Sequence, residues 1–116
     1  MTRLIYHMCR ADEWQVALAT GLYHGSSQDL ADGFIHFSTA DQVQDSAARH
    51  RAGQDGLVLL AVDCRQIETM LKWEMSRRGM MFPHVYGALP VGAVLWARDL
   101  PLDRVTQRHV FPDLGD

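Results

Sequence analysis

The sequence contains little lysine, and no apolar stretch approaches the ~20 residues that cross a bilayer. Lys72 is the only lysine among 11 basic residues, and with 14 acidic residues the formal net charge is −3. This balance disfavours a broad basic surface that binds a phosphate backbone without regard to sequence. The first residues also lack the apolar core and cleavage site of a signal peptide. We therefore expect a cytoplasmic protein without a membrane partner or an extended nucleic-acid surface.

Cysteine is scarce as well, and several motifs that identify metal or nucleotide sites are missing. Cys9 and Cys64 are far apart, and neither belongs to a CxxC pair. We therefore expect small buried thiols, with neither a disulfide nor a cysteine zinc site. The sequence has no HExxH or HxH spacing, and no glycine-rich phosphate loop follows the first predicted strand. A doubly wound parallel fold is accordingly disfavoured.

Length and composition predict one globular domain. The chain has 116 residues, of which 47% are hydrophobic and 22% charged, shares typical of a protein with a packed core. We assign residues 1–116 to a single domain. Residues 102–116 are weakly patterned, and we expect an extended tail that either wraps the surface or mediates self-association.

The hydrophobic pattern predicts strands that alternate with amphipathic helices. Leu57–Val62 is a continuous apolar run between turn signals, which indicates a central strand covered on both faces. Pro83 favours an edge strand or a loop for its own segment. This order predicts an α+β domain with helices packed on a mixed or antiparallel sheet. The predicted elements are strands at 4–8, 34–38, 57–62 and 92–97, helices at 12–21, 39–51 and 66–71, and a polar loop and candidate lid at 22–32.

The stretch from Asp32 to Val43 is the centre of the functional prediction. Its apolar residues favour a strand, which places His36 and Ser38 on one face. The following Thr39-Ala40-Asp41-Gln42 fits a capping box at the start of a helix. Because a helix N-terminus presents unpaired N–H groups and partial positive charge, it suits an anionic or strongly polar ligand.

Several separated motifs occur along the chain. They are Tyr6-His7, a tryptophan-bearing helix that ends at Gly21-Leu22, Gly33-Phe34-Ile35-His36-Phe37-Ser38, the Leu57–Val62 strand, Trp73-Glu74 and Phe82-Pro83-His84-Val85-Tyr86-Gly87. Together they resemble the bacterial family catalogued as domain of unknown function 952. The resemblance extends through about Leu100, and it implies no established reaction.

The front half, through His36-Phe37-Ser38, is also similar to the RNA 2′-phosphotransferases of the ADP-ribosyltransferase superfamily. This similarity implies an ADP-ribosyltransferase-like fold and a small-molecule or nucleotide ligand such as NAD. By matching position, His7 would contact the ribose, and His36 and Ser38 would lie beside it. Glu74 is the nearest candidate for the carboxylate of the superfamily, although its surroundings do not reproduce the superfamily's glutamate motif. The back half around His84 departs from it as well.

The reaction that this resemblance implies explains why these residue types are candidates. Breaking the nicotinamide–ribose bond develops positive charge at the anomeric carbon, which a carboxylate stabilises while histidine or serine donors hold the sugar. A helix N-terminus or an arginine would bind the pyrophosphate. We therefore predict His7, His36, Glu74 and His84 as catalytic residues. For ligand binding we predict His7, Arg10, Ser38 and Thr39.

Each candidate also has a purely structural interpretation. His7 and His36 would then be interior histidines with satisfied ring nitrogens, and His84 would belong to a turn. Ser38 and Thr39 would be helix caps, and Glu74 would form an ion pair with Arg77 or Arg78. Two alternative functions follow: a non-catalytic ligand-binding module, or a metal-dependent hydrolase in which His7, His36, His84 and Glu74 hold the metal.

Overall fold

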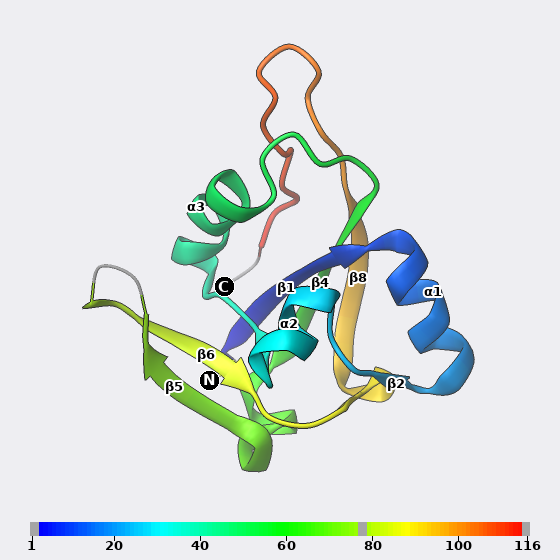
Figure 1. Cartoon of the computed structure of the whole chain (residues 1–116), viewed down its shortest axis with the longest axis vertical. Helices are drawn as coiled ribbons and strands as arrows, with labels where there is room; N and C mark the ends of the chain where they lie inside the picture. Colours follow the sequence, from blue (N-terminus) through cyan, green and yellow to red (C-terminus); the bar gives the residue numbers. More distant parts are fainter. Residues whose placement is uncertain (1–2, 77–78, 115–116) are drawn as a thin grey trace.

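Helices and strands alternate in the first half of the chain, and strands prevail in the second (Figure 1). The computed structural model describes residues 3–76 and 79–114. The helices are α1 (Ala11–Thr20), α2 (Ser27–Asp32) and α3 (Ala40–His50), with short 3-10 turns η1 (Cys64–Gln66), η2 (Glu68–Met70) and η4 (Val91–Ala93). The strands are β1 (Leu4–Arg10), β2 (Leu22–Tyr23), β3 (Ile35–His36), β4 (Leu57–Asp63), β5 (Leu71–Met75), β6 (Met81–Val85), β7 (Leu89–Pro90) and β8 (Val94–Leu100).

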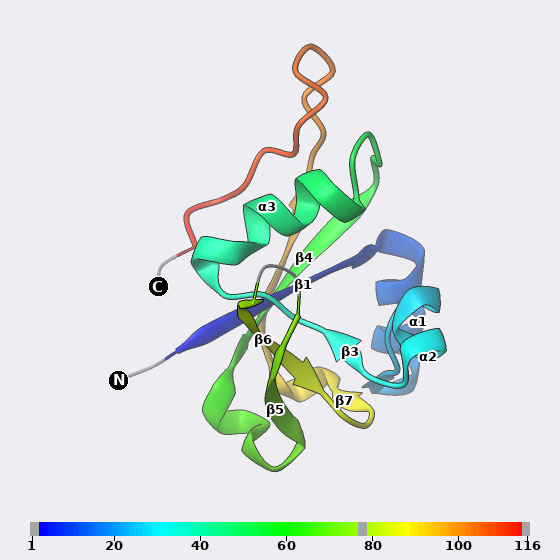
Figure 2. The ribbon, with the colours of Figure 1, turned by 60° about the vertical axis from the view of Figure 1, so that its left-hand side comes forward.

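The first sheet has the strand order β1-β4-β8, so the apolar strand β4 is central, as predicted. Alternate residues of β4 face two separate cores, because successive side chains of a strand point to opposite faces. One core lies under α3, which crosses one face of the sheet (Figure 2), and the other contains Trp14 and Tyr23. The β4 residues of the first core are Leu57, Leu59 and Ala61, and those of the second are Val58, Leu60 and Val62.

The second sheet has the order β3-β6-β5, and β2 pairs separately with β7. All the strand pairings that the structure describes are antiparallel, which confirms the antiparallel form of the predicted α+β class. A two-residue bridge connects the sheets: the Tyr6 N–H donates to the Ser38 carbonyl at 2.8 Å, and the Ser38 N–H donates to the Tyr6 carbonyl at 2.8 Å.

Pro83 lies in the central strand of the second sheet, so the prediction of an edge strand or a loop is wrong. Its carbonyl oxygen accepts a hydrogen bond from the Phe37 N–H at 3.0 Å. Both backbone polar groups of an antiparallel strand residue face the same neighbour, so the missing proline N–H falls on the Phe37 side. Because Phe37 follows the end of β3, the only ladder bond that the proline removes lies beyond the paired segment.

The predicted polar loop at 22–32 contains β2 and the helix α2. Ser26 is the N-cap of α2, because its hydroxyl accepts from the Asp29 N–H at 3.3 Å and its own N–H donates to the Asp29 carboxylate at 2.7 Å. This is a capping box, a local helix signal within a segment of loop-like polar composition. The strand expected at 34–38 is shorter than predicted, because after His36 the chain leaves β6 to pair with Tyr6 at Ser38.

The helices predicted at 12–21 and 39–51 are confirmed, whereas no α-helix forms at 66–71. Gly21 ends α1 in a left-handed conformation with φ 88°, and Thr39 is the N-cap of α3, whose Gln42 carboxamide accepts from the Thr39 N–H at 3.0 Å. The helix expected at 66–71 is present as the two 3-10 turns η1 and η2, and Asp63 caps η1. None of the helices in the described part of the chain is long and apolar enough to cross a membrane.

The tail after β8 turns back on the molecule. Leu102 and His109 form an isolated antiparallel bridge at the base of an excursion that extends away from the sheets (Figure 1). Phe111 and Leu114 then pack against the core under α3, and the Leu114 carbonyl accepts from the Tyr6 hydroxyl at 2.5 Å. The described part of the tail therefore covers its own chain.

Truncating Leu59 tests the position of β4 between two cores. Leu59 is 0% exposed, whereas Leu95 on the neighbouring strand β8 is 61% exposed. We expect Leu59→Ala to lower the free energy of unfolding by about 2–5 kcal/mol, because the change leaves a cavity. Leu95→Ala should lower it by less than about 1 kcal/mol. Urea unfolding measures both, and equal losses would contradict the assigned packing.

Candidate functional site

A cleft lies along the edge of β1 that does not pair with β4. It has a volume of about 590 Å³, and residues of β1, α2, β3, β6 and the C-terminal end of α3 line it. His7, His36 and His84 all contribute to its wall. The structure therefore brings together three histidines that are far apart in the sequence. His36 and His84 meet because β3 and β6 pair them directly, with ring centroids 5.6 Å apart.

Both ring nitrogens of the buried His7 have a hydrogen-bond partner. Nδ1 lies 2.6 Å from the His36 carbonyl oxygen, and Nε2 lies 2.6 Å from the Tyr23 hydroxyl. Because a carbonyl can only accept, Nδ1 carries the proton, and Nε2 accepts from Tyr23 in the neutral ring. Burial lowers the pKa of His7 and favours this neutral form. His7 thus has the carbonyl contact expected of an interior histidine, although it also reaches the cleft.

The carboxylate of Asp29 is buried between His7 and His36. One oxygen accepts from the His36 N–H at 3.0 Å and from His36 Nδ1 at 2.6 Å. The other accepts from the Ser26 N–H at 2.7 Å and the Ser26 hydroxyl at 2.9 Å, and it lies 3.5 Å from His7 Nε2. Burial alone would raise the pKa of Asp29, but the hydrogen bonds, above all that from the His36 ring, hold it well below its usual range. Asp29 is therefore ionised.

His36 faces two carboxylates and remains 41% exposed, so it is a residue of the cleft wall rather than of the sealed interior. Its Nδ1 lies 2.6 Å from Asp29 Oδ1, and its Nε2 lies 3.1 Å from Asp32 Oδ2. Since carboxylates only accept, both contacts are hydrogen bonds when the ring carries two protons. The Phe34 ring packs against His36 with centroids 4.6 Å apart.

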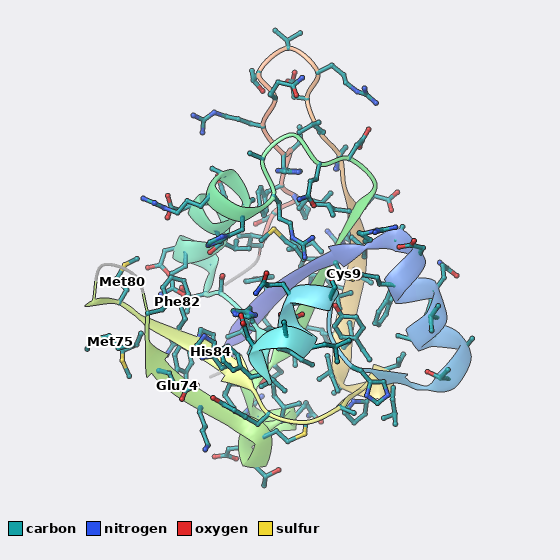
Figure 3. All side chains as sticks on the ribbon, viewed as in Figure 1. Cys9, Glu74, Met75, Met80, Phe82 and His84 are labelled. Atoms are coloured by element: carbon teal, nitrogen blue, oxygen red, sulfur yellow. The ribbon has the colours of Figure 1, made fainter. Side chains whose placement is uncertain are left out.

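His84 and Glu74 form a second histidine–carboxylate pair on the neighbouring strands β6 and β5 (Figure 3). His84 Nδ1 lies 2.8 Å from Glu74 Oε1, and the Tyr86 hydroxyl donates to the same oxygen at 2.7 Å. These two hydrogen bonds, first that from His84, lower the pKa of Glu74. The His84 Nε2 has no partner in residues 3–76 and 79–114. In the neutral ring with Nδ1 protonated, this nitrogen is a free acceptor.

Glu74 does not itself line the cleft, so it reaches the cleft through His84. Arg77 and Arg78, its alternative partners, lie outside the described residues. Phe34 stacks on the His84 ring with centroids 4.1 Å apart and covers both histidine pairs. Stacking of this kind restricts the plane of the imidazole.

The predicted ligand-binding residues differ in their access to the cleft. Ser38 lines it, and its hydroxyl lies 3.0 Å from the Ser46 hydroxyl. Thr39 does not line it; its hydroxyl donates to Asp41 at the start of α3. Arg10 lines the cleft, but its exposed guanidinium donates to Asp12 at 2.7 Å.

Asp29 and Tyr23, two residues that the sequence prediction did not include, lie beside His7. The spacing of Ser26 and Asp29 signals a helix start, but nothing local shows that the carboxylate is buried beneath two histidines. Tyr23 reaches His7 through the tertiary pairing of β2 with β7. Cys9 lies in the same core, where burial raises the pKa of its thiol to about 12, so the reactive thiolate is scarce at neutral pH.

The residues of the alternative metal site do not meet as ligands. Among the described residues, no group of three or more histidine, cysteine, aspartate and glutamate side chains is placed to hold a metal ion. His7 directs its ring nitrogens to Tyr23 and to the His36 carbonyl, and Glu74 directs its carboxylate to His84 and Tyr86.

The fold and the site define a small α+β protein with antiparallel sheets and a histidine-lined cleft between them. The chain belongs to the family described as protein of unknown function DUF952, whose model matches residues 8–97. The family resemblance inferred from the separated motifs is thus confirmed.

Solved structures of one bacterial protein share the fold. The crystal structure of protein CC0527 from Caulobacter crescentus, a structural genomics target, is 46% identical, with a TM-score of 0.87 over 92% of this chain and 93% of that chain. A double mutant of that protein matches equally well. The solution NMR structure of CC0527 is 48% identical, with a TM-score of 0.78 over 88% of each chain. No curated protein matches this chain.

Replacing Asp29 with asparagine tests whether its charge holds the site together. The amide keeps the shape but turns one acceptor into a donor that faces the donors of Ser26 or His36. We expect a loss of about 2–4 kcal/mol in the free energy of unfolding at pH 7. The control Asp45→Asn removes a carboxylate that is 46% exposed on α3, and it should cost less than about 0.5 kcal/mol.

The lowered pKa of Asp29 predicts that the free energy of unfolding depends on pH. Because the pKa of Asp29 is lower in the folded chain than its unfolded value of about 3.9, its contribution is present above that value. The contribution is lost as the pH falls toward the folded pKa, since protonation then favours the unfolded chain. Urea unfolding between pH 7 and 3 should show a smaller acid loss for Asp29→Asn than for the wild type. An identical loss would contradict the role assigned to Asp29.

Proposed function

We propose that the cleft binds NAD or a related nucleotide, and that the chain acts as an ADP-ribosyltransferase-like enzyme. The observation that carries this proposal is the convergence of His7, His36, Ser38 and His84 on one cleft. These are the residues that the similarity to the RNA 2′-phosphotransferases assigns to the ligand, together with His84 from the family motif. The volume of about 590 Å³ falls within the range of about 300–1,000 Å³ that is usual for small-ligand pockets.

The two histidine pairs suit different tasks in group transfer. The Nε2 of His84 has no partner among the described residues, and Glu74 holds its Nδ1 at 2.8 Å, an arrangement that suits a general base. His36 lies between two carboxylates and suits a donor that binds a sugar hydroxyl or phosphate oxygen. NAD would supply an ADP-ribosyl group: the nucleophile would bond to the anomeric carbon while the nicotinamide–ribose bond breaks and nicotinamide leaves. His84 would then accept the proton of the attacking nucleophile, and Glu74 would stabilise the resulting imidazolium.

A non-catalytic ligand-binding module is the second candidate, because the carboxylates that line the cleft are already engaged. Asp29 accepts from Ser26 and His36, Asp32 faces His36, and Glu13 accepts from the Arg10 N–H at 2.8 Å. Stabilising a developing positive charge requires a carboxylate near the reacting carbon. In this reading the same residues bind the nucleotide without turning it over.

Ligand titration tests whether the cleft binds a nucleotide, which both the enzyme and the binding module require. We expect NAD and ADP-ribose to bind in calorimetry and to give saturation-transfer NMR signals, because the cleft offers several histidine and serine donors. His36→Ala should weaken both ligands by about tenfold or more, whereas His109→Ala, outside the cleft, should not. The nucleotide proposal is wrong if neither ligand perturbs the protein at millimolar concentration.

The variant Glu74→Gln separates an enzyme from a binding module. The Gln carbonyl can still accept from His84 Nδ1, so the ring stays oriented while the charge that stabilises an imidazolium is lost. An enzyme should release nicotinamide from NAD about 10²–10⁴-fold more slowly, with little change in affinity. The control Glu68→Gln changes an exposed carboxylate on η2 and should leave the rate unchanged. Wild-type protein that binds NAD without turnover would identify a binding module.

A further inference from the structure

Arg51 is a cation that lines the cleft and that the predicted site residues did not include. It follows the last residue of α3, and its half-buried side chain crosses to the edge of β1. One terminal nitrogen donates to the Met8 carbonyl at 3.0 Å, and the other donates to the Gln54 side chain at 3.2 Å. A guanidinium has five N–H donors, so most of its donor capacity remains for a ligand.

Arg51 has no carboxylate partner among the described residues. Other arginines do: Arg10 pairs with Asp12 and Arg49 with Asp45. A half-buried guanidinium whose protein partners are neutral is electrostatically incomplete, because partial burial removes water without supplying an anion. Such a group is suited to a bidentate contact with an oxyanion.

The edge of β1 beside Arg51 offers a second donor. Tyr6 uses both of its backbone polar groups in the bridge to Ser38, and in an antiparallel strand the direction of these groups alternates from one residue to the next. The N–H and carbonyl of Met8 therefore face the cleft side as well, and the carbonyl accepts from Arg51. The Met8 N–H has no acceptor in the described ranges, and Met8 lines the cleft. A backbone N–H that faces a cleft without a protein acceptor is a donor available to a ligand atom.

The negative groups of the cleft wall restrict where an anion can lie. Asp29 and Asp32 belong to α2, and both are occupied by His36. Glu13 accepts from the Arg10 N–H near the end of β1. An anion is therefore favoured beside Met8 and Arg51, and it is disfavoured beside α2 and beside Glu13. The C-terminal end of α3 is partially negative, which offsets part of the attraction of Arg51.

We infer that Arg51 and the Met8 N–H form an oxyanion subsite, which binds the phosphate or pyrophosphate of the nucleotide. This inference rests on the proposed function and extends it, because it orients the ligand along β1. The sugar lies toward His7, His36 and Ser38, and the phosphates lie beside Met8 and Arg51. Arg51 also acts on His7 through its charge, since it contributes to lowering the pKa of that residue after the larger effect of burial. Arg51 and His7 therefore interact electrostatically.

The variant Arg51→Gln tests the subsite while preserving the contact with β1. A Gln amide still has N–H donors for the Met8 carbonyl, whereas the positive charge is removed. Arg49→Gln is the matched control on α3, because Arg49 is paired with Asp45 at 2.9 Å. The probes are ADP-ribose, inorganic pyrophosphate and adenosine, measured by calorimetry at two salt concentrations. Thermal unfolding of each variant shows whether its fold is preserved.

We expect Arg51→Gln to weaken ADP-ribose and pyrophosphate by about 10- to 100-fold and to leave adenosine unchanged. Arg51→Lys, which keeps the charge, should recover part of the affinity, and higher salt should weaken the wild type more than Arg51→Gln. An amide signal of Met8 that shifts with pyrophosphate in NMR would support the second donor.

Three outcomes overturn the inference, and the first two of them leave the proposed function standing. If the wild type binds ADP-ribose and Arg51→Gln binds it equally well, the subsite is wrong and the nucleotide proposal stands. The subsite is also wrong if Arg51→Gln weakens adenosine as much as ADP-ribose, because the effect is then structural. Wild-type protein that binds neither pyrophosphate nor ADP-ribose refutes both. Binding of pyrophosphate but not of ADP-ribose supports the subsite and refutes the nucleotide proposal.

Discussion

The ionised carboxylate of Asp29 is the interaction on which the cleft depends. A charge removed from water is costly unless donors surround it, and here Ser26 and His36 supply four hydrogen bonds. The same carboxylate caps α2, holds β3 in place and lies 3.5 Å from His7 on β1. A short helix and a two-residue strand would have little stability of their own, so one buried charge organises the wall of the site.

The two histidine–carboxylate pairs are neighbours but are not equivalent. The pairing of β3 with β6 places His36 directly opposite His84, and Phe34 packs on both rings. His36 has a carboxylate at each ring nitrogen, whereas His84 has a carboxylate at Nδ1 and, within residues 3–76 and 79–114, no partner at Nε2. The first environment favours a hydrogen-bond donor and the second an acceptor. This asymmetry underlies the division of roles in the proposed transfer reaction.

The strand β1 lies at the edge of its sheet, and for this reason its backbone groups form part of the cleft wall. Beyond the bridge at Tyr6, the outer edge of β1 contacts side chains in place of another strand. Exposed strand edges are usually covered or blocked, and Arg51 covers part of this one. The Met8 N–H, which has no acceptor in the described part of the chain, is a fixed donor that needs no side-chain ordering when a ligand binds. A cleft of this construction is preorganised along β1.

Much of the fold could be predicted from local patterns. The apolar run at 57–62, the glycine that ends α1 and the capping box at Thr39 each depend on residues close in sequence, and each prediction was confirmed. The prediction for Pro83 was wrong because a central strand tolerates a proline only where a neighbouring strand ends. Here that strand is β3, and its end cannot be read from the residues around Pro83. The segment 22–32 was assigned to a loop because its polar composition masked the capping box of α2.

The sequence by itself determined the class of fold, the family and the three histidines of the cleft, because periodicity and motifs are properties of short stretches. Only the tertiary structure decided what each histidine contacts. Asp29, Tyr23 and Arg51 act on residues that strand pairing and helix packing bring near them. Their surroundings, which set burial, protonation and the availability of a ligand contact, come from distant parts of the chain. Those quantities depend on distances in space, and no local pattern encodes them.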